Sequence, residues 1–152
     1  MWLRIDAQSG VPIYRQIAAQ IEALRYHRDG DKLSTIWIDL PTAGELGERF
    51  GEECREVLMR QVNRVLQQHS RTGDMLFRTD ESTFALMILY TPGEHLQRLA
   101  DRLREQLGRL EFTDPNHEVH RLRALITVVP YERESRQDYL EKIGAARKAT
   151  AA

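Results

Sequence analysis

The chain has 152 residues, of which 41% are hydrophobic, so it is long enough to bury one sizeable core and too short to favour a second. Its 22 lysines and arginines nearly balance 23 aspartates and glutamates, which excludes a general basic surface for nucleic acid or anionic lipid. The single cysteine, Cys54, excludes an internal disulfide, and no apolar run reaches membrane-spanning length. We therefore expect one domain over residues 1–152, in the cytoplasm and without membrane insertion.

The first half of the chain alternates between helical and strand-like patterns. Apolar residues at helical spacing predict an amphipathic helix over residues 13–24. The β-branched and aromatic residues of 32–40 predict a buried strand that ends at Asp39. Helical spacing returns over residues 43–68, with a break expected near Gly51.

The second half begins with a predicted hairpin. Two strand-like runs, 74–78 and 83–90, are separated by only four residues. A leucine stripe predicts a helix over 95–110, and after a loop the apolar run 121–129 predicts another strand. A short helix over 135–149 closes the chain. This order predicts an α+β sandwich, with a mostly antiparallel central sheet flanked by helices.

Five segments occur in an order and at spacings that are similar to those of one protein family. They are DAQSGVPIY at 6–14, TIWIDL at 35–40, FGEECREVLMRQVNRVL at 50–66, RTGDMLFRTDESTFALMIL at 71–89 and ITVVP at 126–130. Together they resemble the GGDEF domain, the nucleotide-cyclase-like module of bacterial diguanylate cyclases. The resemblance runs over nearly the whole chain and implies the same α+β fold.

The DESTF segment, residues 80–84, occupies the place of the GGDEF signature. Asp80 and Glu81 replace two glycines, and side chains there would obstruct and repel the phosphates of a nucleotide. Ser82 replaces a carboxylate that would share magnesium with a strand-end aspartate. Asp39 matches that aspartate but is only a residual half-site. The resemblance therefore implies an inactive cyclase with no catalytic residues, no magnesium and no other cofactor.

Other positions of the family pattern have also changed. Pro41 stands where the family has another aspartate, and Gly47 and Glu56 stand where it has the residues that read guanine. Arg78 precedes the signature as in the family and is expected either to point outward from the hairpin or to contact a ligand. The residues TDES, 79–82, are in themselves typical of a solvated turn.

The first part of the hairpin segment keeps a family feature. RTGD, residues 71–74, ends six residues before Asp80, where product-inhibited diguanylate cyclases carry Arg-x-x-Asp. The family adds an arginine on the next helix, and the count from Asp80 places it at Arg102. The resemblance thus implies a cyclic di-GMP site formed by Arg71, Asp74 and Arg102. Arginine forks suit guanine and phosphate acceptors, and a carboxylate suits guanine N–H donors.

This interpretation has a plain structural alternative. The segments RDGD at 28–31 and RLAD at 98–101 fit the same four-residue pattern, so the pattern alone is weak. A surface ion pair between Arg71 and Asp74 that caps the hairpin would explain the two residues without any ligand.

The start of the chain also resembles another family. MWLRIDAQSGVPIYRQIAAQI at 1–21 and LPTAGELGERFG at 40–51 are similar to segments of GntR-type winged-helix regulators. The recognition helix of such a protein would begin here with Glu52 and Glu53, where DNA contacts need positive charge. DNA binding is therefore the least favoured alternative, and we expect no nucleic-acid partner.

The resemblance to GGDEF domains implies a receptor that binds cyclic di-GMP and alters a protein partner in a bacterial signalling or secretion system. Such a receptor would control exopolysaccharide, biofilm or motility. The chain would be a module of a longer multidomain protein and could form a homodimer. The competing hypothesis is a scaffold that keeps the fold, binds no nucleotide and acts by protein contact or dimerisation.

The spacing of the histidines does not predict a metal site. Only His117 and His120 have a spacing that metal ligands use, and they fall in a predicted loop without an obvious third ligand. We expect both to be surface residues.

Overall fold

The computed structural model describes residues 12–24, 33–71, 73–89 and 91–152. The described elements are, in chain order, α1 (Pro12–Leu24), β1 (Leu33–Asp39), α2 (Pro41–Phe50), α3 (Glu52–His69), β2 (Met75–Asp80), β3 (Thr83–Leu89), α4 (Gly93–Gly108), β4 (Glu111–Thr113), β5 (Val119–Arg121), β6 (Leu125–Pro130) and α5 (Arg136–Ala151). Residues 1–11 and RDGD at 28–31 lie outside this part of the chain. None of the described helices is long and apolar enough to cross a membrane.

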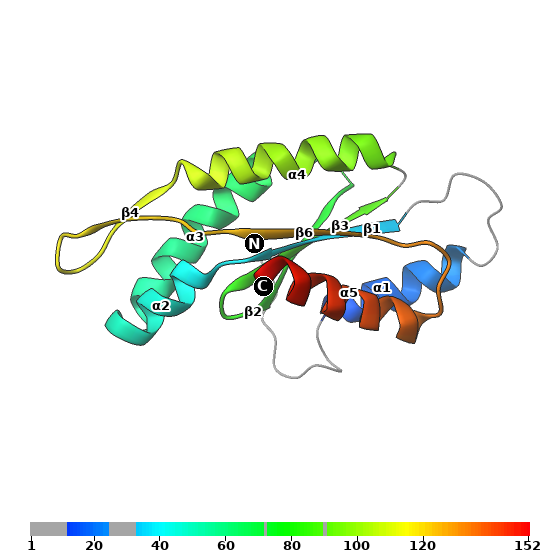
Figure 1. Ribbon diagram of the computed structural model, residues 1–152, viewed down its shortest axis with the longest axis horizontal. Helices are drawn as coiled ribbons and strands as arrows, with labels where there is room; N and C mark the ends of the chain where they lie inside the picture. The colour runs from blue at the N-terminus through cyan, green and yellow to red at the C-terminus, as the bar shows by residue number, and fades with distance from the viewer. Residues whose placement is uncertain (1–11, 25–32, 72, 90) are drawn as a thin grey trace.

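Strands β2, β3, β1 and β6 form, in that order, a sheet whose neighbours all pair antiparallel. Helices α3 and α4 cover one face of this sheet, and α1 and α5 cover the other (Figure 1). This arrangement confirms the predicted α+β sandwich with an antiparallel central sheet.

The core has two parts because side chains of a strand alternate between the two faces of the sheet. Ile36 and Ile38 of β1 belong to the apolar cluster under α2, α3 and α4. Leu33 and Trp37 belong to the cluster under α1 and α5. Strand β1 is therefore buried on both faces, which explains why its consecutive residues Ile36, Trp37 and Ile38 are all apolar.

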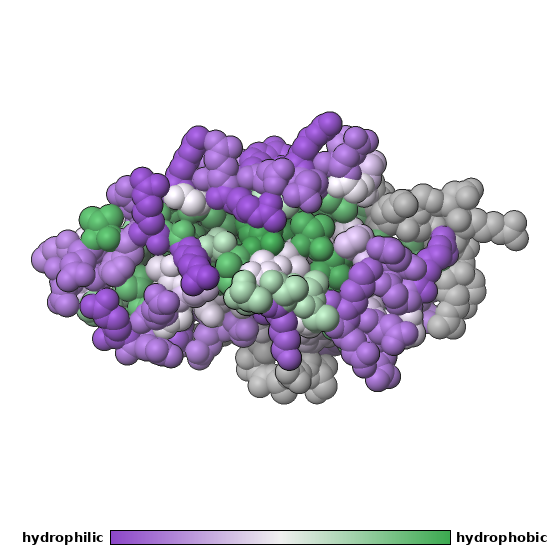
Figure 2. Space-filling model, in the orientation of Figure 1, coloured by the Kyte–Doolittle hydropathy of each residue, from purple (hydrophilic) through white to green (hydrophobic). Residues whose placement is uncertain are grey.

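The outer faces of the helices are polar. Figure 2 shows hydrophilic residues over α4 and α5, with hydrophobic residues visible in a band between them, where β6 runs. Leu125 and Val128 of this edge strand are only partly buried.

The break predicted near Gly51 is confirmed, since α2 ends at Phe50 and Gly51 has a φ of 96°, a value that favours glycine. The strand predicted over 121–129 is present as β6, but it begins four residues later, at Leu125, and Arg121 belongs to β5 instead. The segment 111–118 was predicted to be a loop, whereas its first three residues form β4, which pairs with β5 in a separate two-stranded hairpin. Strands of three residues are too short to show a clear sequence period.

A chain of buried hydrogen bonds attaches α5 to the sheet. Trp37 Nε1 donates to Thr35 Oγ1 at 2.8 Å, and Tyr139 Oη donates to the carbonyl of Val129 at 2.7 Å. Because the single hydroxyl proton of Tyr139 is used in this way, Thr35 donates the 2.9 Å bond between Thr35 Oγ1 and Tyr139 Oη. Burial raises the pKa of Tyr139, so its hydroxyl stays protonated over the physiological range.

We expect the Tyr139→Phe substitution to lower the free energy of unfolding by about 1–3 kcal/mol, because it removes two buried hydrogen bonds. Urea denaturation followed by tryptophan fluorescence measures the change. The matched control is Tyr14→Phe, on a half-buried tyrosine that stacks on Trp37, with an expected change of about 0.5 kcal/mol or less. Equal changes in the two variants would contradict this account of α5.

Candidate functional site

Two of the three residues that the sequence predicts for ligand binding, Arg71 and Arg102, line one surface pocket. The pocket has a volume of about 260 Å³ and lies between the end of α3 and the first turns of α4. Its lining residues are His69, Arg71, Thr91, His95, Arg98, Leu99 and Arg102. The fold thus brings the RTGD loop and α4 together.

Helix α4 contributes a row of basic side chains to this pocket. His95, Arg98 and Arg102 are spaced i, i+3 and i+7, so they lie on one face of the helix. All three are exposed. The resemblance pointed to Arg102 and not to His95 or Arg98, although their helical spacing from Arg102 can be read in the sequence.

Arg71 lies at the edge of the pocket, with 58% of its side chain exposed. Its guanidinium donates a hydrogen bond to Thr91 Oγ1 in the loop before α4. Thr91 in turn donates to the carbonyl of Leu89 at 3.2 Å. The end of β3 therefore helps to hold the Arg71 side chain beside α4.

Asp74, the third predicted residue, does not belong to the pocket lining. Its side chain is only 5% exposed, and Asp74 Oδ2 accepts the backbone N–H of Arg71 at 2.9 Å. Arg71 Nε lies 3.9 Å from the same oxygen, so the expected ion pair is present but long. Between the two, Gly73 has a φ of 100°, which lets the chain turn back. In this geometry Asp74 fixes the loop that carries Arg71.

One of the two expectations for Arg78 was that it points outward from the hairpin. The structure shows that it does not. Only 6% of the residue is exposed, and its guanidinium donates to both carboxylate oxygens of Glu56 at 2.6 and 2.5 Å. Arg78 also donates to the carbonyls of Asp80 at 3.0 Å and Glu81 at 2.6 Å. This arginine therefore joins α3 to the turn that occupies the signature position.

Arg55 packs over the position that the resemblance assigns to guanine recognition. A Cβ atom at Gly47 would lie 2.8 Å from Arg55 Nη1, so any larger residue at position 47 would have to displace this side chain. Arg55 Nη1 lies 3.4 Å from a carboxylate oxygen of Glu81, and Arg55 Nε lies 3.7 Å from Glu56. Arg55 therefore pairs with Glu56 and Glu81 in the space between α2, α3 and the hairpin turn.

Asp39, the residual half-site for a metal, is held by an arginine from the far end of the chain. Arg147 of α5 donates to Asp39 Oδ1 at 2.6 Å and to Oδ2 at 3.2 Å, and Thr83 Oγ1 donates to Oδ1 at 2.8 Å. The Arg147 guanidinium also lies 4.9 Å from the ring centroid of Trp37. No sequence signal pointed to Arg147, which is 108 residues from its partner.

The ion pair with Asp39 also affects the titration of Arg147. Burial alone would lower the pKa of Arg147, but the hydrogen bonds and negative charge of Asp39 raise it above its ordinary value. The arginine therefore remains charged, and the carboxylate at the end of β1 is already neutralised within the chain.

Comparison with known proteins identifies similar sequences and structures. The curated diguanylate cyclase DosC of Escherichia coli strain K12 is 23% identical over 97 residues, which are 64% of this chain and 21% of that protein. The GGDEF domain of DgcB from Caulobacter crescentus, solved in complex with c-di-GMP, has a TM-score of 0.80 at 12% identity, over 98% of this chain and 92% of that one. The chain spans only about a fifth of the length of the curated relatives it matches.

A further similar structure contains a second protein. The diguanylate cyclase SiaD of Pseudomonas aeruginosa, in complex with its activator SiaC, has a TM-score of 0.79 at 15% identity, over 96% of this chain and 57% of that one. At these identities the structural likeness shows the fold alone. The sequence model described as "Diguanylate cyclase, GGDEF domain" matches residues 5–152. Because this match covers nearly the whole chain, the protein belongs to the GGDEF domain family of diguanylate cyclases.

Proposed function

We propose that this GGDEF domain is a catalytically inactive receptor for cyclic di-GMP, with the ligand bound at the pocket between α3 and α4. Arg71 and Arg102 contact the dinucleotide, and Asp74 holds the loop that presents Arg71. The observation that carries this proposal is that Arg71 and Arg102, 31 positions apart in the sequence, line one basic pocket.

The chemistry of the pocket suits an anionic ligand with guanine bases. Arg71, Arg98 and Arg102 supply planar forks for phosphates and for the acceptor edge of guanine, and no acidic residue is among the described residues that line the pocket. A volume of about 260 Å³ is small for a ligand pocket, so it holds part of the dinucleotide and leaves the rest exposed.

The residues at the positions where the resemblance places the nucleotide and its magnesium support the proposal of inactivity. Both carboxylate oxygens of Asp39 accept hydrogen bonds, so a magnesium ion would have to displace Arg147. Ser82 supplies no second carboxylate, and Arg55 packs over Gly47 where a guanine would lie. A nucleotide and its metal would therefore have to break paired charges before binding.

The receptor would act through a protein partner in a bacterial signalling or secretion pathway that controls exopolysaccharide, biofilm or motility, in the cytoplasm. SiaD, which shares this fold, is solved in complex with its activator SiaC. We do not propose DNA binding, because Glu52 and Glu53 are exposed in the first turn of α3 and would repel phosphates.

Calorimetric titration with cyclic di-GMP tests the receptor site. We expect saturable binding to the wild type and an affinity about 10- to 100-fold lower in Arg71→Ala and in Arg102→Ala, because each loses hydrogen bonds between charged groups. The matched control is Arg109→Ala, an exposed arginine at the end of α4 that pairs with Glu105 outside the pocket.

The outcomes of this titration distinguish an error in the receptor proposal from an error in the location of the site. If the wild type gives no saturable heat, the receptor proposal is wrong and the scaffold hypothesis takes its place. Equal affinity in the wild type, Arg71→Ala and Arg102→Ala would show that the ligand binds elsewhere.

A turnover assay with GTP and Mg²⁺ tests the proposed inactivity. We expect no dinucleotide product by chromatography from the wild type, because Asp39 is paired with Arg147 and Ser82 is a weak metal ligand. An active diguanylate cyclase in the same buffer is the positive control. Product formed by the wild type at a rate above that of a matched Asp39→Asn variant would overturn the proposal.

A further inference from the structure

The hairpin of β4 and β5 carries a cluster of side chains that the proposed nucleotide site does not use. This hairpin extends beyond the main sheet at the end of the molecule where α2 and α3 meet (Figure 1). From the sequence, His117 and His120 were expected to be surface residues without a third ligand. The structure instead brings His120 together with two carboxylates, those of Asp114 and Glu118.

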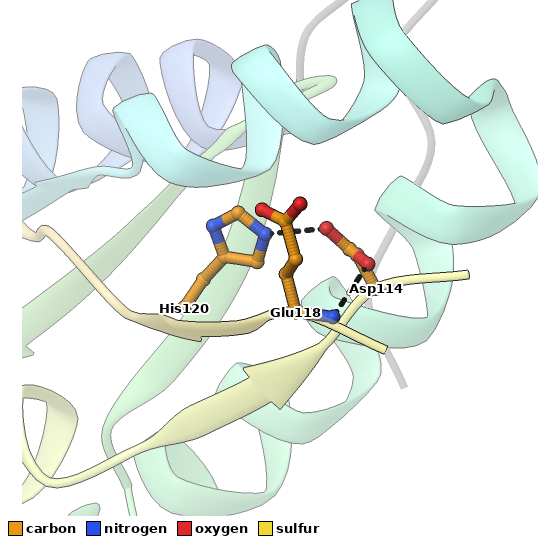
Figure 3. A group of neighbouring side chains, drawn as sticks. All are labelled: Asp114, Glu118 and His120. Carbon is orange, nitrogen blue, oxygen red and sulfur yellow. Dashed lines mark hydrogen bonds and ion pairs between the residues drawn. The ribbon is translucent and has the colours of Figure 1, made fainter. Parts of the chain in front are cut away.

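The three side chains converge on one point. The ligand atoms of Asp114, Glu118 and His120 all lie within 4.8 Å of one another, and His120 Nε2 lies 2.7 Å from Asp114 Oδ2. In Figure 3 the Glu118 carboxylate lies beside the facing His120 ring and Asp114 carboxylate. Two ligands of one transition-metal ion, each about 2.1 Å from it, are about 3.0–3.4 Å apart, so small movements would admit an ion between them.

The turn fixes Asp114 in the orientation that a metal ligand needs. Asp114 Oδ1 accepts the backbone N–H groups of Asn116 at 2.7 Å and Glu118 at 3.0 Å. Those bonds leave Oδ2 directed at His120, and the Asp114 side chain has no solvent exposure. Hydrogen bonds that orient a ligating carboxylate through its other oxygen are a common feature of metal sites.

The spacing along the chain places the other two ligands together. Glu118 directly precedes β5 and His120 lies within it, two positions further on, so they lie on the same side of the hairpin. His120 pairs in register with Phe112, which is buried, so this side faces the body of the domain. Val119, between them, points the opposite way and is 60% exposed.

The surroundings favour a cation. Asp114 also lines a groove of about 580 Å³ between α3 and the hairpin, together with Glu53 and Glu111. No lysine or arginine is among the described residues that line this groove. Arg121 lies 3.9 Å from Glu111, so the negative charge that would attract a divalent ion comes from Glu53, Asp114 and Glu118.

We propose that Asp114, Glu118 and His120 form a binding site for one divalent transition-metal ion of the zinc class. An imidazole with two carboxylates is a ligand set that suits Zn²⁺ and is less suited to Mg²⁺ or Ca²⁺, which prefer oxygen ligands alone. Water completes the coordination. The bound ion ties the turn of the hairpin to β5, and the site is independent of the nucleotide pocket.

Titration of the whole chain with Zn²⁺ against a chromophoric chelator tests the site. We expect one ion per chain and an affinity at least about tenfold lower in Glu118→Gln and in His120→Gln. Glu118→Gln is the cleaner variant, because the bond from position 118 to Asp114 comes from the backbone N–H and survives the substitution. Addition of Zn²⁺ should raise the midpoint of thermal unfolding in the wild type and not in these two variants.

The matched control is His117→Asn, an exposed histidine of the same turn that lies outside the cluster and has a φ of 65°, which asparagine tolerates. We expect it to bind Zn²⁺ as the wild type does. The proposal is wrong if the wild type binds no Zn²⁺, if Glu118→Gln and His120→Gln bind it equally well, or if His117→Asn loses binding. Binding of Mg²⁺ with the same affinity as Zn²⁺ would also contradict it.

Discussion

Strand β1 is buried on both faces and paired on both edges, and the other elements take their positions from it. All seven of its residues pair with β3, and six pair with β6. The alternation along the strand then decides the rest, since Ile36 and Ile38 meet α3 and α4 while Thr35 and Trp37 meet α5. A shift of one residue in this register would exchange the two halves of the core.

Arginines have two different roles in this domain, and the fold decides which role each one has. Arg78 and Arg147 are each bonded to both oxygens of a carboxylate from another element, Glu56 and Asp39. The pocket at α4 instead collects arginines from two segments without an acidic residue in its described lining. The first kind pairs with carboxylates next to the 80–84 turn and at the end of β1. The second kind leaves positive charge at the pocket that would attract an anion.

Local patterns predicted the fold well, whereas pairings between distant residues could not be predicted. The apolar run of β1, the hairpin around residues 79–82 and the leucine stripe of α4 each show their period within a few residues. The ion pair between Asp39 and Arg147 joins residues 108 positions apart, and no periodic pattern in the sequence indicates such a pairing. Asp114, Pro115 and Asn116 do indicate a turn, but the three-residue strands β4 and β5 that flank it are too short to show a period, so the sequence did not predict this hairpin.

The place of α5 and β6 in this sheet has a consequence for the order in which the domain is made. The inner strand β1 is synthesised before β6, but one of its edges is filled by residues 125–130 of β6 and its end by Arg147. On the ribosome, the growing chain would therefore carry a strand with one open edge until residues 125–130 have emerged. Protection of that edge during synthesis is a requirement of this topology, whatever ligand the finished domain binds.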